Sequence, residues 1–336
     1  MSTYVIAEAG VNHNGDLDTA CRMIDAAKEC GCDCVKFQTF KTELLVTKYA
    51  AKADYQTVNT GSSESQFEML KKLELSYDDF GKLKDRCDSL GIDFLSTPFD
   101  DESVDMLYEL GMKSFKMSSG DITNKPLLEH VAKKGKPVIL STGMCTMDEV
   151  EEAVGWIEAC GNKDISLLHC TSNYPTPYED VNMRSMLALK ERFPYKVGYS
   201  DHTKGIIIPM MAVSMGAEII EKHFTLDKNM NGPDHKASLE ISELKEMVGS
   251  IRQIESAFGD GIKRPSGGEI STREVARKSI IVKRRISAGT IITDEDLSIK
   301  RPGSGLAPKF LDTIIGKRAL KDMEPEYIIT PDDYAG

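Results

Sequence analysis

Short apolar runs rich in β-branched residues alternate with longer stretches of helical periodicity through the first 260 residues. This alternation is typical of strand and helix units arranged around a parallel sheet. Eight strands are predicted, at Tyr4–Ala9, Cys34–Gln38, Phe94–Thr97, Ser114–Ser118, Val138–Ser141, Ile165–Cys170, Val197–Ser200 and Ile219–Phe224. Eight such units over about 250 residues favour an α/β fold of the closed (β/α)8 TIM-barrel type over an open sheet.

The stretches between these strands carry the helical pattern. Helices are predicted at Leu17–Cys30, Tyr77–Leu90, Ser103–Leu110, Leu127–Lys134, Met147–Ala159, Arg184–Phe193 and Ile208–Met215. A glycine, which takes the left-handed cap conformation at little cost, closes six helical units, at Gly31, Gly91, Gly111, Gly135, Gly161 and Gly216. A polar insertion at 41–66 follows the second strand before any clear helix begins, and we expect it to be a substrate loop.

The composition changes near the end of the eighth unit, where glycine and proline become frequent from Gly259 to Gly268. Such a break predicts a linker between domains. We expect a catalytic barrel at 1–262, a linker at 263–278 and a small β module of short strands and turns at 279–336. The module is too small to be the catalytic core.

The net charge narrows the choice of ligands. There are 42 Lys and Arg residues against 53 Asp and Glu residues, a formal net charge of −11. A field of this sign repels nucleic acid and anionic membranes, so we expect neither as a partner. Any anionic ligand must therefore be bound by a local cationic pocket.

The N-terminus and the cysteines predict a cytoplasmic protein. The first ten residues contain no basic region and reach Glu8 after a few apolar residues, unlike a signal peptide or an anchor. The eight cysteines have no secretory context, so we expect thiols in a reducing compartment. Cys30, Cys32 and Cys34 lack the spacing of a zinc knuckle and are predicted to be core thiols.

Polar side chains recur where each predicted strand ends. A barrel collects its chemistry at the carboxyl ends of the strands and fills the rest of the interior with apolar groups. Any single Ser or Thr in such a place is most often structural, but a set from eight strands predicts an active site. The set comprises Glu8, Lys36, Gln38, Ser96, Thr97, Lys116, Ser118, Ser119, Ser141, Thr142, His169, Thr171, Ser200, His202, Glu221 and His223.

Lys36 and Lys116 are the cations of this set, and hydroxyl groups of Thr97, Ser119 and Ser141 accompany them. Cations with hydroxyl donors suit a phosphate or a carboxylate. The alternative is that a lysine forms a structural ion pair with Glu8 or Glu221.

His202 and His223 end neighbouring strands, so both imidazoles can reach one cation. A pair of histidines leaves coordination positions for water and substrate, which fits a Lewis-acid metal better than a closed zinc site. Manganese tolerates such mixed ligands. His13, His169 and His235 are weaker candidates.

Ten segments, in order along the chain, resemble the bacterial sialic acid synthase family, and the resemblance runs from about residue 3 to about residue 330. The tail from Ser279 resembles that family's C-terminal module, which is similar to type III antifreeze proteins (the SAF type) and serves as a binding lid. The segments are AEAGVNHNGD (7–16), VKFQTF (35–40), STPFD (96–100), KMSSGD (116–121), LSTGM (140–144), LLHCTSNYPTP (167–177), YSDH (199–202), EKHFTLDK (221–228), GPDH (232–235) and KRPGSG (300–305).

The resemblance implies condensation of phosphoenolpyruvate with an open-chain N-acetylmannosamine-type sugar and water. The products would be a nine-carbon 2-keto-3-deoxy acid and phosphate, released by carbon–oxygen cleavage. A divalent metal is implied, Mn²⁺ first and Mg²⁺ or Co²⁺ as alternatives. We predict N-acetylmannosamine as the acceptor, giving N-acetylneuraminate. The alternative is a 2,4-diacetamido-2,4,6-trideoxymannose, giving legionaminic acid.

The resemblance also implies roles for individual residues. It makes His202 and His223 the metal ligands. It implies that Arg301 reaches the active site of the partner subunit in a domain-swapped homodimer. Phosphoenolpyruvate contacts are implied for Lys36, Thr97, Lys116, Ser119, Ser141 and Ser200. Sugar-side and acid–base positions are implied for Glu8, Gln38, Tyr174, Glu221 and Asp234, and for Asp121, where the family pattern has the longer Glu.

Three other functions fit part of the pattern. A Schiff-base aldolase would use Lys116 as nucleophile and would leave both histidines without a role. A barrel that only binds sugar would not require two lysines and two histidines at strand ends. The C-terminal module could also be an independent binding domain, whose deletion would spare activity.

Overall fold

The structure is a computed structural model of the 336-residue chain and describes residues 2–61 and 64–335. The chain forms two compact units, Met1–Phe258 and Gly259–Gly336. The range predicted as a linker lies in the second unit and contains a helix, α12 (Glu269–Ala276).

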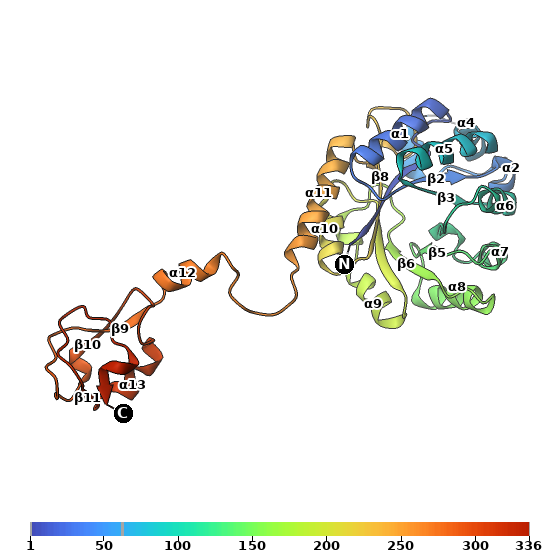
Figure 1. The fold of residues 1–336 in the computed structure, drawn as a ribbon. Coiled ribbons are helices and arrows are strands. Elements are labelled where there is room, and N and C mark those ends of the chain that lie inside the picture. Colours follow the sequence, from blue (N-terminus) through green and yellow to red (C-terminus); the bar gives the residue numbers. More distant parts are fainter. Residues whose placement is uncertain (1, 62–63, 336) are drawn as a thin grey trace. The chain divides into compact units, whose positions relative to one another are not determined.

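The first unit contains one parallel sheet of eight strands in the order β3-β2-β1-β8-β7-β6-β5-β4 (Figure 1). The end strands β3 and β4 pack against each other, so the sheet curves into a near-closed barrel, as the sequence predicts. The strands are β1 (Tyr4–Gly10), β2 (Cys34–Thr39), β3 (Asp93–Pro98), β4 (Phe115–Met117), β5 (Val138–Ser141), β6 (Ile165–Cys170), β7 (Lys196–Asp201) and β8 (Ile219–His223).

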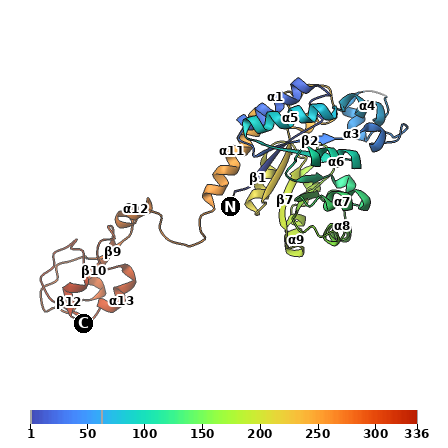
Figure 2. The same cartoon turned by 45° about the vertical axis from the view of Figure 1, so that its right-hand side comes forward.

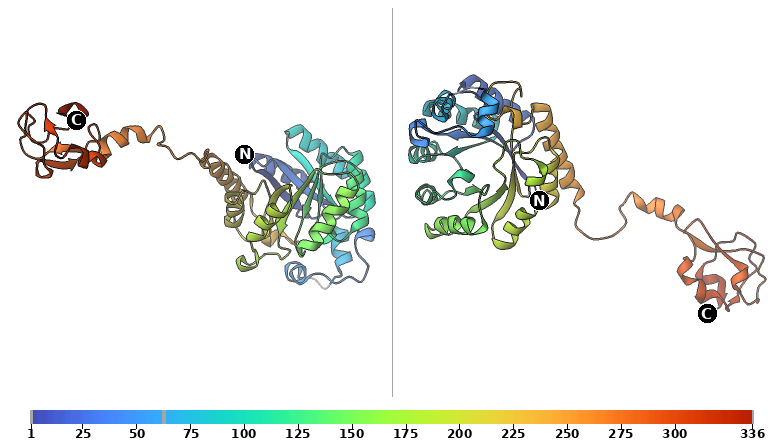
Figure 3. Two further views of the ribbon diagram at one scale, coloured as in Figure 1. Left: turned by 90° about the horizontal axis from the view of Figure 1, so that it is seen from below. Right: turned by 180° about the vertical axis from the view of Figure 1, so that it is seen from behind.

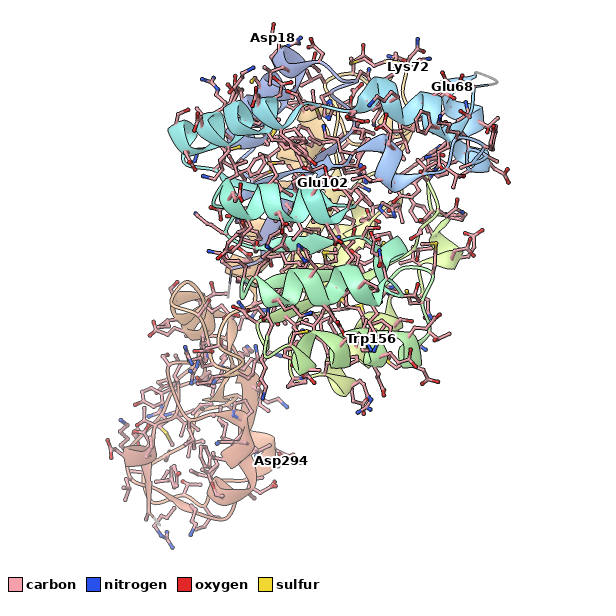
Figure 4. All side chains as sticks on the ribbon, turned by 90° about the vertical axis from the view of Figure 1, so that its right-hand side faces the viewer. Asp18, Glu68, Lys72, Glu102, Trp156 and Asp294 are labelled. Atoms are coloured by element: carbon pink, nitrogen blue, oxygen red, sulfur yellow. The ribbon has the colours of Figure 1, made fainter. Side chains whose placement is uncertain are left out.

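Helices surround this sheet on its outside (Figures 2 and 3). They are α1 (Leu17–Glu29), α5 (Tyr77–Leu90), α6 (Asp101–Glu109), α7 (Lys125–Lys133), α8 (Met147–Ala159), α9 (Arg184–Arg192), α10 (Ile207–Ser214) and α11 (Ile241–Ala257). The polar side chains Asp18, Glu68 and Glu102 project from the outer helices into solvent (Figure 4). Within the described residues, no helix combines the length and apolarity that crossing a bilayer requires.

Local sequence fixes where these helices begin and end. Side chains of Asp16, Ser76, Asp100 and Thr146 accept backbone hydrogen bonds in the first turns of α1, α5, α6 and α8. All six glycines predicted to close helical units have positive φ angles, between 65° and 89°. The predicted caps are therefore confirmed.

The insertion after β2 differs from the prediction, because short helices occupy it. They are α2 (Thr42–Leu45) and α3 (Asp54–Thr60), followed by α4 (Gln66–Leu73). Ser65 and Glu68 form a reciprocal capping box at the start of α4. Because the whole segment is polar, this capping signal does not stand out in the sequence. Residues 62 and 63 of the predicted loop lie outside the described part of the chain.

The second unit is a small β module, as predicted, with its own apolar core. Its strands are β9 (Ser279–Val282), β10 (Leu297–Lys300), β11 (Arg318–Ala319) and β12 (Tyr334–Ala335). Two similar turns precede β10 and β12. In each, a threonine hydroxyl donates to an aspartate three residues later, from Thr293 to Asp296 at 2.6 Å and from Thr330 to Asp333 at 2.9 Å.

Candidate active site

A cavity of about 430 Å³ opens at the carboxyl ends of the barrel strands, where the sequence places its polar set. Residues predicted from the sequence to form the site are among those that line it. The full set of predicted residues at the wall is Glu8, Lys36, Gln38, Thr97, Lys116, Ser118, Ser119, Ser141, Tyr174, Ser200, His202, Glu221 and His223.

Lys36 lies in a carboxylate-rich part of the cavity. Its Nζ is 2.7 Å from Glu8 Oε2, 3.8 Å from Glu221 Oε2 and 3.2 Å from Thr97 Oγ1. Burial lowers the pKa of Lys36, but Glu221 and Glu8 outweigh it and raise the pKa above its usual value. Lys36 is therefore held as a buried cation.

Lys116 approaches the same carboxylate from the other side. Its Nζ donates to Ser141 Oγ at 2.7 Å and lies 3.7 Å from Glu221 Oε1. Ser200 Oγ donates to the same oxygen of Glu221 at 3.0 Å. Burial lowers the pKa of Lys116. The two lysines thus flank Glu221 and present hydroxyl groups beside them, a suitable arrangement for an anion carrying phosphate and carboxylate.

The two buried glutamates differ in ionisation. Burial raises the pKa of Glu8 to about 7, against the attraction of Lys36, and the charge on Glu221 adds to the rise. Burial also raises the pKa of Glu221, but Lys116 and Lys36 outweigh it and bring the pKa below its usual value. Carboxylates whose environments drive their pKa values apart take different acid–base roles. Glu8 is the one able to exchange a proton near neutrality.

His202 and His223 face each other with ring centroids 5.4 Å apart. His202 Nδ1 lies 2.7 Å from the carbonyl oxygen of Thr171, which orients the ring and leaves Nε2 for a ligand. Burial and the neighbouring His202 hold the pKa of His223 well below its usual value, so its ring is neutral. Its buried Nδ1 has no hydrogen-bond partner among the described residues. The ring of His223 can therefore donate a lone pair to a cation. Burial lowers the pKa of His202, but Cys170 outweighs it and raises the pKa above its usual value, so His202 donates through Nε2 in its neutral form.

These histidines would bind a metal largely by themselves. In the described part of the chain, no group of three or more His, Cys, Asp and Glu side chains converges on one metal position. A two-histidine site leaves the remaining positions to water and substrate oxygens. The donor set fits a catalytic divalent cation rather than a structural one.

An aromatic stack closes one side of the cavity. The Tyr174 ring lies 3.9 Å from that of His202 and 4.9 Å from that of Tyr55, measured between centroids. Tyr55 belongs to α3, and Asn59 of the same helix donates to Pro233 O at 2.6 Å. The sequence analysis predicted the insertion as a substrate loop but did not identify Tyr55. The segment around Tyr55 is polar, so nothing in its pattern marks this tyrosine as a site residue.

Cys170 is a second residue that sequence reasoning missed. It was predicted as one thiol among eight, yet it lines the cavity, with Sγ 3.8 Å from His202 Nδ1. Gly143 packs closely beside it. Its N–H donates to Ser119 Oγ at 2.8 Å, and a Cβ there would overlap Ser172 Oγ. This close approach holds the Ser119 hydroxyl at the cavity wall.

Two predicted site residues of the first unit, Asp121 and Asp234, do not line the cavity, and a third belongs to the second unit. Asp121 accepts a 3.3 Å hydrogen bond from Asn124, and burial raises its pKa. Asp234 is buried near His202, and burial raises its pKa to about 6. Arg301 is exposed in the second unit, directly after β10.

The remaining histidine and cysteine predictions have clear outcomes. His13 accepts a hydrogen bond from Gly15 N, and His235 bonds Thr225, away from the histidine pair. His169 contacts the carbonyl oxygen of Val181. All eight cysteines are free, and the run Cys30, Cys32 and Cys34 is buried, which confirms the predicted core thiols.

Comparison with known proteins identifies the class. The model of the NeuB family matches residues 23–263, and that of the SAF domain matches residues 277–335. The chain therefore belongs to the NeuB family and carries a SAF domain. This confirms the resemblance drawn from the motifs and the nature of the small module.

Named relatives cover nearly the whole chain. An N,N'-diacetyllegionaminic acid synthase of Legionella pneumophila is 50% identical over 95% of this chain and 90% of its own length. The human N-acetylneuraminate-9-phosphate synthase is 39% identical over 96% and 90%. The crystal structure of an N-acetylneuraminic acid synthetase from Leptospira borgpetersenii in complex with citrate is 37% identical over 81% of this chain and 90% of that one, with a TM-score of 0.71.

The protein is a phosphoenolpyruvate-dependent nonulosonic acid synthase, whose substrates are phosphoenolpyruvate and an amino sugar. Enzymes of this family typically depend on a metal. Family membership excludes the Schiff-base aldolase and the non-catalytic barrel as primary functions.

Proposed function

We propose that this synthase condenses phosphoenolpyruvate with a 2,4-diacetamido-2,4,6-trideoxymannose to give N,N'-diacetyllegionaminic acid and phosphate. The observation that carries the choice of acceptor is the 50% identity to the Legionella enzyme over 95% of the chain. This reverses the order of the two acceptors predicted from the sequence, where N-acetylmannosamine came first.

The cavity lining supports an uncharged acceptor. Among the described residues that line it, the Lys and Arg side chains are Lys36 and Lys116, and both already face Glu221. A phosphorylated sugar would need a further cation, because burying a phosphate without one is costly. The apolar groups of Ala53, Phe99 and Met144 suit the methyl groups of a deoxy, diacetamido sugar.

Phosphoenolpyruvate would bind between the two lysines. Lys36 and Lys116 neutralise its charges, and the hydroxyl groups of Thr97, Ser119 and Ser141 donate to its oxygens. Glu221 holds both ammonium groups in place. This binding fixes C3 of the enol toward the acceptor aldehyde, which converts the encounter into a reaction within one complex.

His202 and His223 would hold a divalent metal, Mn²⁺ by preference, with Mg²⁺ or Co²⁺ as alternatives. Bound there, the metal supplies Lewis-acid polarisation of the aldehyde oxygen. Tyr174 packs on the ring of His202. Gln38 and Tyr174, which line the cavity, are the side chains we assign to the sugar. Asp234 and Asp121 join them on the resemblance of their segments to the family motifs.

Carbon–carbon bond formation leaves positive charge at C2 of the former enol. Water adds to C2, and Glu8 takes its proton, since the pKa of Glu8 is about 7. The bond from C2 to the bridging oxygen then breaks while the new C2 hydroxyl gives up its proton and becomes the ketone, and phosphate leaves with the bridging oxygen and takes up this second proton of the water. The proton given up by water balances the proton gained by the aldehyde oxygen. Lys36 and Lys116 stabilise the departing phosphate.

We propose that the second unit also takes part in the reaction. We assign Arg301 to the active site of a partner subunit in a domain-swapped homodimer, where it would bind an acceptor or carboxylate oxygen. The resemblance of segment 300–305 to the family motif supports this role.

Initial rates of phosphate release test the acceptor. With phosphoenolpyruvate and Mn²⁺ present, kcat/KM for the diacetamido sugar is expected to exceed that for N-acetylmannosamine by at least about 10-fold, since one site that fits extra groups gains about 1–3 kcal/mol. N-Acetylmannosamine 6-phosphate should be the poorest of the three. Equal or better use of N-acetylmannosamine would contradict the assignment.

A further inference from the structure

A buried ion pair lies directly behind the two histidines. Lys222 Nζ is 2.5 Å from Asp201 Oδ2, and both side chains have 0% exposure. Asp201 and Lys222 are register partners across β7 and β8. Because successive side chains of a strand face opposite ways, this pair points away from the cavity that Glu221 and His223 line. The pair therefore takes no part in binding substrate directly.

Asp201 also fixes the chain on both sides of His202. Its Oδ1 accepts from Tyr199 Oη and from Thr203 N, each at 3.0 Å. Its Oδ2 accepts from Thr203 Oγ1 at 3.0 Å. Lys222 Nζ adds a hydrogen bond to the Thr203 carbonyl oxygen. The residues before and after His202 are thus tied to the residue before His223.

A contribution to the free energy of unfolding does not by itself explain why Lys222 and Asp201 are buried here. Desolvating two charges costs several kcal/mol per ion, and apolar replacements of buried ion pairs are often neutral or stabilising. The pair does join the end of β7 to the end of β8 by an oriented hydrogen bond, and these two strand ends carry His202 and His223. Groups that orient metal ligands from outside the ligand set govern metal affinity strongly.

We propose that Lys222 is a positioning residue that, through Asp201, holds His202 and His223 at the spacing needed to bind one divalent cation. This inference rests on the metal role proposed for the two histidines. Lys222 and Asp201 touch neither substrate nor metal.

The chain offers a control ion pair at the opposite end of the barrel. Arg252 Nη2 lies 2.8 Å from Asp33 Oδ2, and Asp33 also accepts from Val5 N at 2.8 Å. This ion pair links α11 to the start of β2, far along the strands from the histidines. Arg252→Met therefore removes an ion pair whose side chains are 33% and 35% exposed, without disturbing the metal ligands.

Mn²⁺ binding to the full-length protein, followed by the electron paramagnetic resonance signal of free Mn²⁺ without substrates, tests the proposal. Lys222→Met is expected to weaken binding by roughly 10- to 100-fold, while Arg252→Met stays within about twofold of the wild type. His223→Ala should bind Mn²⁺ still more weakly.

Each other result has a definite meaning. Wild-type affinity in Lys222→Met, with weak binding in His223→Ala, overturns the positioning role and leaves the metal site intact. Wild-type affinity in His223→Ala overturns the metal site and the inference together. If Lys222→Met does not fold, Thr203→Val decides, because it removes only the hydroxyl donor to Asp201. That variant should weaken Mn²⁺ binding several-fold, and unchanged affinity overturns the proposal.

Discussion

Lys116→Met is expected to lower kcat for phosphate release by about 10³-fold, because it removes a preorganised cation from the departing phosphate. Lys116 is 2% exposed, and its ammonium group donates to Ser141 and faces Glu221, so its loss leaves Lys36 as the remaining lysine of the described cavity lining. KM for phosphoenolpyruvate should also rise. The measurement is steady-state phosphate release with saturating acceptor and Mn²⁺.

Lys125→Met provides the control for this substitution. Lys125 is an exposed lysine of α7 whose ion pair with Glu129 is on the surface, and surface pairs contribute little. Its replacement should leave kcat unchanged. A Lys116→Met enzyme that is folded, as judged by circular dichroism, and retains more than about a tenth of the wild-type kcat would contradict the proposed phosphate site.

Glu8→Gln is expected to lower kcat by at least about 10²-fold and to abolish the acid limb of the pH profile. A general base works only when deprotonated. With a pKa of about 7, the ionised fraction of Glu8 falls tenfold for each pH unit well below 7. Wild-type kcat should therefore rise with pH up to about 7 and then level off. The measurement is kcat between pH 5.5 and 8.5 with both substrates saturating.

Glu221→Gln tests whether the acid limb comes from Glu8 acting as general base or from the loss of any buried carboxylate charge in the cavity. The two lysines keep the pKa of Glu221 below its usual value, so Glu221 stays ionised throughout that pH range. Its replacement should lower kcat by loosening Lys36 and Lys116 but should preserve the acid limb. Loss of the limb in Glu221→Gln and its retention in Glu8→Gln would reverse the two assignments.

The barrel and much of its site could be predicted because parallel strands impose a simple rule. Side chains alternate along each strand, so Lys36 and Gln38 on one strand and Glu221 and His223 on another must share the barrel interior. Polar residues at these strand ends can only meet at the mouth. The structure brings them together there, with Glu8 and Lys36 as register partners.

The features that sequence reasoning missed depend on contacts between distant segments. Tyr55 reaches the cavity because Asn59 attaches α3 to the loop at Pro233, 174 positions along the chain. Cys170 stands beside His202 only after β6 and β7 pair. In the second unit, β11 and β12 contain two residues each, and a strand of two residues is too short to show a hydrophobic periodicity in the sequence.

The identity of the acceptor sugar cannot be predicted from strand alternation. The two sugars differ at two carbons, since the diacetamido sugar has an acetamido group in place of one hydroxyl and hydrogen in place of another. A few side chains around α3 and the β5 end distinguish such groups, and the fold does not. Whole-chain similarity to a named synthase therefore supports that choice better than any single motif of this sequence does.

Turnover of phosphoenolpyruvate labelled with ¹⁸O in the bridging position, followed by ³¹P magnetic resonance, tests the central claim most directly. With the diacetamido sugar and Mn²⁺, attack by C3 and water addition at C2 require the label to leave in phosphate. Phosphate that carries the bridging ¹⁸O, formed only when acceptor is present, is the predicted result. Unlabelled phosphate would mean cleavage between phosphorus and oxygen, and would contradict the condensation derived from Lys36, Lys116 and Glu8.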